Sequence, residues 1–391
     1  MENLENTSNV ENTSNVENTS LEIPFFKPFF DKSESELIAR ALNGEKSTAI
    51  FEAKVASYYG AKYAIATNNG TAAKHLALCA MDIKRGDKII CPVNSFVSLP
   101  EVIRYFGAEP IFADIDKDDF CLEPAALESV IKANQSKKLK AVFLTHLGGQ
   151  SAKIDIIKQI CEKYGLKIIH DSAFGVRYNG ALVGGGDEFM GCFGFQHSGL
   201  NQIASSGIIL TNDDKIAARA KLFRSHAMEQ KRLDDGSLAY IYDVKHIGQR
   251  YDLDALSAAF CLAQFCKNEI NIKAHQHIAR LYDEKLANIA HISTPVKKRD
   301  HIYTQYIIKV DKNRDGFAKE LLAGGIGVGL HYVPLHLLSY YRKKYNYRIT
   351  DFPAALGAYS QVLSLPIYPA LSEAEIEHIC KVITRIASAR V

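Results

Sequence analysis

The residues best suited to chemistry lie between Ile168 and Leu210, in IIHDSAF and then in GCFGFQHSGLNQIASSGIIL. Asp171 closes a short apolar run that is typical of a buried strand, and a polar loop, Gln196 to Ser206, follows the next such run. A carboxylate can hold a cationic group, and the imidazole of His197 can act as a general base near neutral pH. No lysine occurs from Ile168 to Asp214, so this stretch offers no amine for a covalent imine.

A second candidate site is the turn Asn69-Gly70-Thr71, which joins the run YAIAT to a helical pattern. The start of a helix presents backbone N–H groups, and Thr71 adds a hydroxyl, so the turn suits a phosphate. A capped helix with no ligand explains the same three residues, and taken alone they favour that simpler interpretation.

The elements that must position these residues are seven short apolar runs separated by helical patterns. This alternation predicts an α/β fold with a mostly parallel sheet covered on both faces. Ligands bind such sheets at the carboxyl ends of the strands, where Asp171 and the polar loop are expected. The predicted strands are Tyr63 to Thr67, Lys88 to Pro92, Glu109 to Ile115, Lys140 to His146, Lys167 to Asp171, Met190 to Phe195 and Gly207 to Thr211.

These segments resemble the DegT/DnrJ/EryC1/StrS family of sugar aminotransferases. HDSAF is similar to the family's (E/H)DAAQ, and FGFQHSGLNQIASSGIIL to FSFHPxKxxTxGxGGxVxT. NNGTAA, NSFVS, HLGGQ, RYDLDALSAAFCLAQF and GIGVGLHYVPLH are similar to SSGTAA, TFVAT, HLYGQ, NYRMSEIQAAIGLAQL and GIxTxxHYxPLH. The resemblance implies a fold-type I, pyridoxal phosphate transferase scaffold. It has a large domain over residues 21–266, a small C-terminal α+β domain over 267–391, and a homodimer with its sites at the subunit interface.

The resemblance also implies roles for individual residues. Asp171 would pair with the pyridine nitrogen, Phe96 would stack on the ring, and Asn69, Gly70 and Thr71 would cradle the phosphate. Arg250 stands where the family has an Asn that reaches the neighbouring subunit's cofactor phosphate. His331 and Tyr332 match a substrate-contacting segment. An aromatic side chain such as Phe96 is usually ordinary core, and His331 may equally be structural in its Gly-rich turn.

Four positions depart from the family pattern. Aligned without gaps from Phe193 to Gly207, the Schiff-base lysine is Gly199; Gly194 replaces a phosphate-binding Ser, Phe174 replaces a Gln near the ring hydroxyl, and Arg250 replaces the Asn. We therefore expect no internal aldimine, and pyridoxal or pyridoxamine phosphate held non-covalently if bound at all.

Three functions fit these features. The first is a pseudo-enzyme or nucleotide-sugar-binding subunit of amino- or deoxy-sugar biosynthesis, as a homodimer or beside an active homologue. The second is a lysine-independent enzyme with His197 as base, because the family's GDP-sugar 3-dehydratases carry His at the lysine position and use pyridoxamine phosphate. A lone loop histidine more often makes an ordinary hydrogen bond. The third is a structural or regulatory protein whose thermal stability responds to no small ligand.

The composition sets the remaining bounds. The chain has 391 residues, 47% of them hydrophobic and 23% charged, with a net charge of +3, so charge gives no reason to expect nucleic acid or a membrane surface as partner. Eight dispersed cysteines without a Cys-x-x-Cys spacing favour reduced thiols in the cytoplasm over disulfides or a metal site. Residues 1–20 repeat ENTSNV and predict a disordered tail, with no signal peptide and no membrane span.

Outside the predicted sheet, local patterns indicate further elements. SESELIARALNGE predicts a helix after a Ser cap, and IFEAKVASYYGAK a helix that ends at Gly60. GFAKELLAGGIGVGLHYVPLHLL predicts a helix near the C-terminal end, and EQKRLDDGSLAYIYDVKHIGQ a polar loop.

Overall fold

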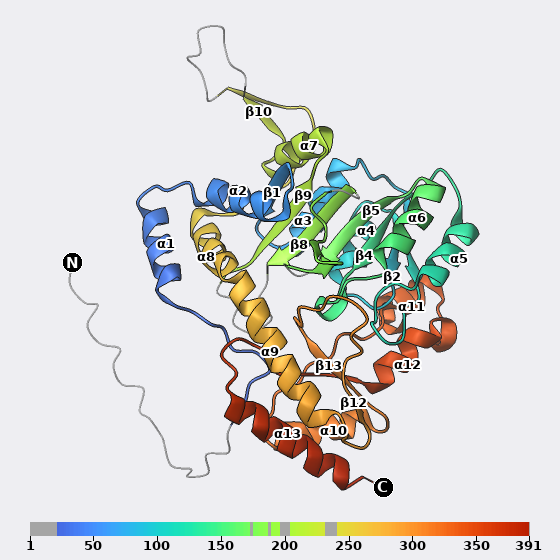
Figure 1. Ribbon diagram of the computed structural model, residues 1–391. Coiled ribbons are helices and arrows are strands. Elements are labelled where there is room, and N and C mark those ends of the chain that lie inside the picture. The colour runs from blue at the N-terminus through green and yellow to red at the C-terminus, as the bar shows by residue number, and fades with distance from the viewer. Residues whose placement is uncertain (1–21, 173–174, 187–188, 196–203, 231–240, 391) are drawn as a thin grey trace, which may run out of the picture.

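A seven-stranded sheet with the order β1-β9-β8-β5-β4-β2-β3 forms the centre of the larger part of the molecule (Figure 1). The computed structural model describes residues 22–390 except 173–174, 187–188, 196–203 and 231–240. The sheet strands are β1 (Tyr63–Thr67), β2 (Lys88–Pro92), β3 (Glu109–Ala113), β4 (Leu139–Thr145), β5 (Lys167–Ser172), β8 (Phe189–Phe195) and β9 (Ser206–Thr211). All seven predicted strands are confirmed, with small shifts at their ends.

The strand directions bring several carboxyl ends to one edge. The pairs β2–β3, β2–β4, β4–β5 and β5–β8 are parallel, whereas β9 is antiparallel to both β8 and β1. Because two reversals restore the direction, β1 runs the same way as β8 and β5. Its carboxyl end, where the turn at Asn69 begins, therefore lies at the same edge as Asp171.

Both faces of the sheet are covered, as β1 shows. Ile65 packs into the core that contains Leu76, whereas its neighbours Ala64 and Ala66 pack into the core that contains Phe51. Alternate strand residues point to opposite faces, so each face has its own apolar layer. The helices of this part are α1 (Lys32–Leu42), α2 (Ser47–Tyr59), α3 (Gly70–Ala80), α4 (Ser98–Tyr105), α5 (Pro124–Asn134), α6 (Ile154–Tyr164), α7 (Asp214–Arg224) and α8 (Ala255–Cys266).

The first two helices show how local sequence sets helix ends. Helix α1 is capped by Asp31, whose side chain accepts from Ser33 N while Glu34 bonds back to Asp31 N. The prediction of a Ser cap was wrong, because Asp31, two residues before Ser33, caps the helix and forms a complete capping box with Glu34. Helix α2 ends as predicted at Gly60, whose φ of 66° suits glycine.

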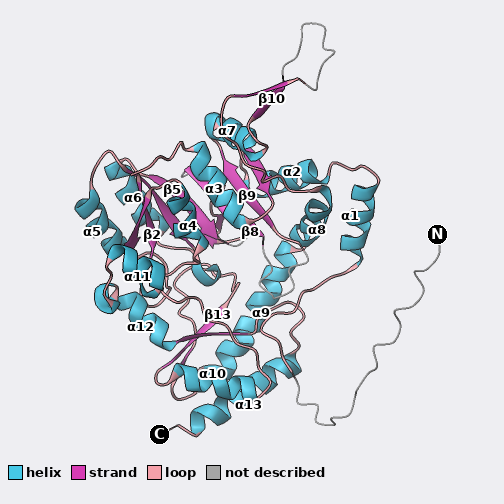
Figure 2. Cartoon of the chain, turned by 180° about the vertical axis from the view of Figure 1, so that it is seen from behind, coloured by secondary structure: helices cyan, strands magenta, loops and turns pink. Residues whose placement is uncertain are grey.

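A second apolar core lies beside the sheet, at the end of the long helix α9 (Asn268–Leu286) (Figure 2). It contains a three-stranded antiparallel sheet of β12 (Ile292–Ser293), β13 (Tyr306–Val310) and β14 (Val362–Leu365). Ile23 joins this core through a bridge to Ile326. The helices α10 (Arg314–Ala323) and α13 (Glu373–Ser388) also pack into this core. The helices α11 (Ser339–Tyr345) and α12 (Pro353–Gln361) instead bury Tyr341, Ala355 and Ala358 in the core of the larger part. None of the helices in the described ranges has both the length and the apolar character that a bilayer crossing requires.

Two local predictions were wrong. Helix α10 ends at Ala323 and does not extend through GGIGVGLHYVPLHLL, because Gly324 and Gly325 close it. The expected polar loop after α7 contains the paired strands β10 (Met228–Gln230) and β11 (Tyr242–Val244), which project from the body (Figure 1). Two further short strands, β6 (Arg177–Tyr178) and β7 (Ala181–Leu182), form a separate hairpin.

Candidate functional site

The site is built around Asp171 at the carboxyl end of β5. Asp171 lies in register with Thr145 of β4 and Cys192 of β8, so the three side chains share one face of the sheet. The Oγ1 atom of Thr145 is buried and has no hydrogen-bond partner within the described residues. Burial, followed by the negative charge of Asp171, raises the pKa of the Cys192 thiol, which stays neutral. Asp171 and Thr145 thus form a polar floor at the carboxyl edge of the sheet, which is where open α/β folds bind ligands.

Lys74 of α3 reaches this floor and forms an ion pair with Asp171. Its Nζ lies 3.1 Å from Asp171 Oδ1, and the two side chains are only 9% and 14% exposed. The sequence analysis missed this residue, although a signal was present. In GTAAKHLALCA, Lys74 is the only charged side chain among mostly small and apolar residues. A lysine in such a buried helix needs a carboxylate partner.

The start of α3 lies at the same edge. Asn69 caps the helix, and its Oδ1 accepts a hydrogen bond from Ala72 N at 2.8 Å. Gly70 packs against Gly194 of β8, where a Cβ on Gly70 would lie 2.7 Å from Gly194 Cα. A Cβ on Gly194 would lie 3.5 Å from Gly70 Cα, an ordinary contact. A Cβ is therefore tolerated at position 194, so this contact alone does not require a glycine there.

Two aromatic side chains, Phe96 and Tyr332, lie next to each other beside the site. Phe96, which follows β2, is 56% exposed, and its ring centroid lies 5.9 Å from that of Tyr332. The backbone N–H of Tyr332 donates to Asn94 Oδ1 at 3.1 Å. Burial raises the pKa of Tyr332 to about 12, and the nearby charge of Asp171 adds to the rise. Phe96 and Tyr332 are thus brought to the site from two separate parts of the chain.

His331 faces the other way. Its Nδ1 lies 2.8 Å from Ser364 Oγ, and its ring stacks on Phe25 with centroids 5.9 Å apart. Burial lowers the pKa of His331 to about 4, so the imidazole is neutral at pH 7. These contacts hold the second core against the N-terminal segment, and a substrate contact by His331 stays a prediction.

Of the remaining predicted residues, Arg250 lies at the margin of the site, and the others lie outside the described residues. The side chain of Arg250 is exposed, and the next residue, Tyr251, accepts a backbone hydrogen bond from Asn68 N at 3.0 Å. The chain thus carries Arg250 close to the start of α3. Phe174, His197 and Gly199 lie outside the described residues.

Two buried histidines, His146 and His170, form a hydrogen-bond network next to Asp171. His146 Nε2 and His170 Nδ1 lie 2.9 Å apart, and Ala152 N donates to His146 Nδ1 at 3.0 Å. Burial holds the pKa of His146 well below its usual range. The backbone N–H of His146 also donates to the backbone carbonyl of Asp171 at 3.1 Å, so this network fixes the end of β5.

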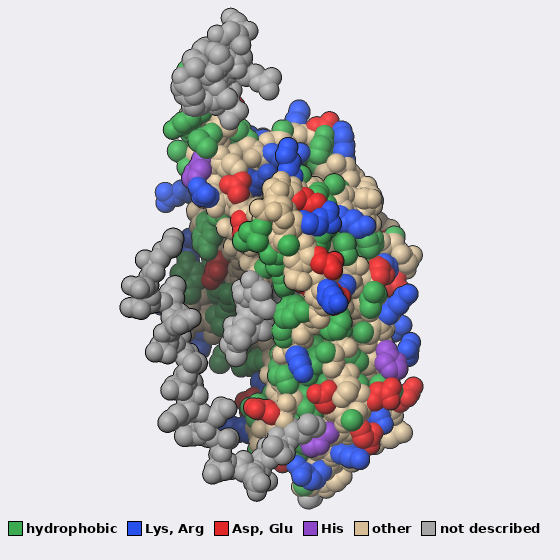
Figure 3. All heavy atoms as spheres, turned by 90° about the vertical axis from the view of Figure 1, so that its left-hand side faces the viewer, with side chains coloured by type: hydrophobic (Ala, Val, Ile, Leu, Met, Phe, Trp, Pro, Cys, Tyr) green, Lys and Arg blue, Asp and Glu red, His purple; other side chains and the backbone are tan. Residues whose placement is uncertain are grey.

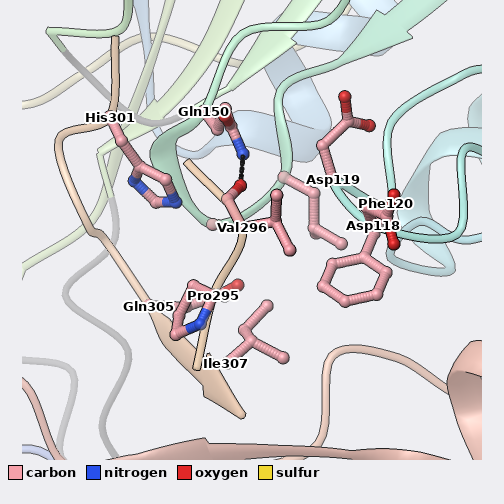
Figure 4. A pocket seen from close by; sticks show the side chains of 11 residues that line it. Asp118, Asp119, Phe120, Gln150, Pro295, Val296, His301, Gln305 and Ile307 are labelled. Atoms are coloured by element: carbon pink, nitrogen blue, oxygen red, sulfur yellow. Dashed lines mark hydrogen bonds between the residues drawn. The ribbon is translucent and has the colours of Figure 1, made fainter. Parts of the chain in front are cut away.

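A narrow cavity lies between the segment after β4 and the loop that precedes β13, and Asp171 is not among its lining residues (Figure 4). Gln150, from the HLGGQ segment, joins these two segments. Its Nε2 donates to Val296 O at 3.2 Å, and its Oε1 accepts from the N–H groups of Lys298 and Arg299 at 2.7 and 3.0 Å. Gln305 lines the cavity too and has a buried Oε1 without a partner in the described part of the chain. The cavity is a structural junction beside the site at Asp171.

The chain is similar to proteins of known families over almost all of its length. It is 30% identical to the uncharacterised protein MJ1066 of Methanocaldococcus jannaschii, over 94% of this chain and 98% of that protein. It is 29% identical to the spore coat polysaccharide biosynthesis protein SpsC of Bacillus subtilis, over 93% of this chain and 97% of that protein.

Among solved structures, S. venezuelae DesV, crystallised with a ketimine intermediate, superimposes with a TM-score of 0.83 and 26% identity, over 94% of this chain and all of DesV. This match agrees with the fold-type I architecture predicted from the sequence. The family model for DegT/DnrJ/EryC1/StrS aminotransferases matches residues 34–384. The chain therefore belongs to the DegT/DnrJ/EryC1/StrS family of sugar aminotransferases.

Proposed function

We propose that this chain is a member of the family that binds a nucleotide-sugar and does not transaminate. The observation that carries the proposal is the absence of the amine where the family pattern has it: position 199 is Gly, and no lysine occurs from Ile168 to Asp214. Transamination needs a primary amine that exchanges with the cofactor aldehyde and moves the α-proton. A chain without this amine keeps the scaffold and loses that step.

The residues at the site fit only part of the family's cofactor, pyridoxal phosphate. The start of α3, with Gly70 and Thr71, suits the phosphate. At the ring end, however, Asp171 would have to offer its charge to a protonated pyridine nitrogen, and Lys74 already neutralises that charge. The residues at Asp171 therefore do not fit a protonated pyridine ring, because Lys74 already occupies the carboxylate. Any pyridoxal or pyridoxamine phosphate would be held non-covalently and weakly.

A direct assay tests the proposal. We expect purified protein, incubated with pyridoxal phosphate and then desalted, to show no imine absorbance, and to transfer no amino group from glutamate to a keto-sugar nucleotide. Robust transamination would overturn the proposal. An active family member, assayed in parallel, shows that the substrate and conditions are competent.

A second candidate function is a lysine-independent enzyme of the 3-dehydratase kind. The observation that favours it is His197, two residues before Gly199 in the same polar loop. An imidazole there would act as the base that removes a sugar proton. If turnover of a keto-sugar nucleotide is found with pyridoxamine phosphate, His197→Asn should abolish it without lowering the melting temperature. An unchanged rate would remove His197 from this role.

We further propose that the chain is a homodimer. Exposed apolar side chains gather on the β10–β11 hairpin and beside it: Met228, Tyr242, Val244 and Ile247, of which Ile247 is 88% exposed. Figure 3 shows apolar side chains on one side of the base of this projection, beside basic side chains. Phe96 is also largely exposed at the site, as expected if a second subunit covers its ring. Arg250 would then contact the neighbouring subunit's ligand, and an active homologue is an alternative partner.

The cellular setting follows from the thiols. All eight cysteines are free, and burial raises the pKa of most of them, as in Cys121 and Cys192. Free buried thiols are typical of a reducing compartment, so we propose the cytoplasm, with neither nucleic acid nor membrane as partner.

A further inference from the structure

The buried ion pair of Lys74 with Asp171 places a positive charge at the site, a feature separate from the missing lysine at position 199. The ion pair with Asp171 is buried, with Lys74 as a whole residue only 7% exposed. The lysine comes from α3, the same helix whose first residues face the expected phosphate. One helix therefore presents an anion-binding end and, one turn later, a cation directed at the carboxylate.

The chemistry of a carboxylate beside a pyridine ring explains why this matters. An unpaired buried carboxylate favours a proton on a neighbouring ring nitrogen, because the cation that forms is attracted to it. An ammonium 3.1 Å from the same carboxylate supplies that positive charge permanently. A second cation beside Asp171 would be repelled by Lys74 and would gain little from Asp171.

We propose that Lys74 is a specificity-determining residue: its ammonium takes the place of a protonated ring nitrogen beside Asp171, so the site rejects a pyridine cofactor and selects a phosphate-bearing ligand whose other end is uncharged. Because Asp171 is already paired with Lys74, this face of the sheet offers no net charge to the far end of such a ligand. This inference rests on the proposed function and names the ligand class of its site.

Lys74 does not supply the missing amine while the ion pair holds. An amine attacks an aldehyde through its nitrogen, and the Lys74 Nζ is held 3.1 Å from Asp171 Oδ1, on a side chain that is only 9% exposed. The same contact that fills the place of the ring nitrogen therefore suppresses imine formation at Lys74.

The test uses pyridoxamine phosphate, which carries the ring and the phosphate but has no aldehyde. We expect the wild-type chain to bind it weakly in a titration and to show almost no rise in melting temperature. Lys74→Met should bind it at least about tenfold more tightly, because the ring nitrogen can then take the proton and pair with Asp171. The variant's melting temperature, lowered without ligand, should recover on adding it.

Three controls keep the outcome decisive. Lys267→Met removes a lysine from another buried ion pair, with Glu34, and should lose stability without gaining affinity. Lys74→Met combined with Asp171→Asn should bind no more tightly than wild type, because the carboxylate is gone. Lys74→Gln keeps a hydrogen-bond donor to Asp171 and replaces Lys74→Met should that variant fail to fold.

Two results would overturn the inference. One is equal affinity for pyridoxamine phosphate in wild type and in Lys74→Met or Lys74→Gln. The other is borohydride reduction that fixes pyridoxal phosphate to Lys74 of the wild-type chain, found by mass spectrometry. Equal affinity without transamination would leave the proposed function intact, whereas transamination by the wild-type chain would overturn the proposed function itself.

Discussion

At the scale of single residues, Gly70 and Gly194 determine how closely α3 approaches β8. A Cβ on Gly70 would lie 2.7 Å from Gly194 Cα, closer than side-chain carbons approach backbone atoms. The family resemblance identified Gly70 as part of a phosphate turn, but sequence alone did not show this packing role. Lys74 was missed for a related reason: its partner Asp171 is 97 residues away, and only the fold brings the two together.

We expect Gly70→Ala to lower the free energy of unfolding by about 1–3 kcal/mol, because the new methyl group forces two backbone segments apart. Gly357→Ala in α12 is the matched control, since a Cβ there meets nothing within 4 Å. That substitution should be neutral or raise stability by about 0.5–1 kcal/mol, the usual gain from replacing a helical glycine. Urea denaturation measures both, and equal effects would show that the Gly70–Gly194 contact has no energetic weight.

At the scale of elements, the strands that could be predicted from the sequence are those with a continuous apolar run. The strands of the main sheet are continuous apolar runs, so β1, β2 and β5 were found with nearly correct ends. The strands β10 and β11 are three residues each and carry no such run, and they form only because they pair with each other. Their apolar side chains are exposed in the single chain, which makes this hairpin the element best suited to meet a second subunit.

Ile247→Glu should therefore weaken dimerisation at least about tenfold, because it would bury a charge in an apolar contact. Ile156→Glu is the control: Ile156 is 50% exposed, and it lies on α6, away from the hairpin (Figure 1). Sedimentation velocity over a range of concentrations measures the two dissociation constants. A monomeric wild type, or equal weakening by both changes, would contradict the proposed interface.

At the scale of the whole molecule, charged side chains join distant segments of the chain next to Gln150, which accepts a hydrogen bond from Lys298 N. Asp116 lies 3.0 Å from the amines of Lys153 and Lys298. Burial alone would raise the pKa of Asp116, but the hydrogen bonds from Asp118 N, Lys153 and Lys298 outweigh it and hold the pKa well below its usual range. Sequence analysis had no access to this network, because its members are separated by long stretches of chain. The domain boundary near Lys267 stays a prediction.

A carboxylate whose pKa is depressed on folding stabilises the protein above its unfolded pKa, and this contribution disappears as the pH falls through the folded value. Lys298→Met should therefore lower the free energy of unfolding by about 1 kcal/mol at pH 7. The difference from wild type should shrink as the pH falls below about 4, the usual pKa of Asp. Lys381→Met, in the exposed pair with Glu377, should have little effect at any pH. A difference that is constant from pH 7 to pH 2 would exclude this role for Asp116.

The buried pair of Lys74 and Asp171 also constrains the mutational history of the chain. Restoring a lysine at position 199 alone would return an amine to a site whose carboxylate is already occupied. Removing Lys74 alone would leave a buried charge unpaired and lower stability before any activity could be gained. Neither single change would therefore restore transamination, because each leaves the other obstacle in place, and the departures at positions 174, 194 and 250 would remain. An ion pair of this kind makes the loss of transamination hard to reverse by single substitutions.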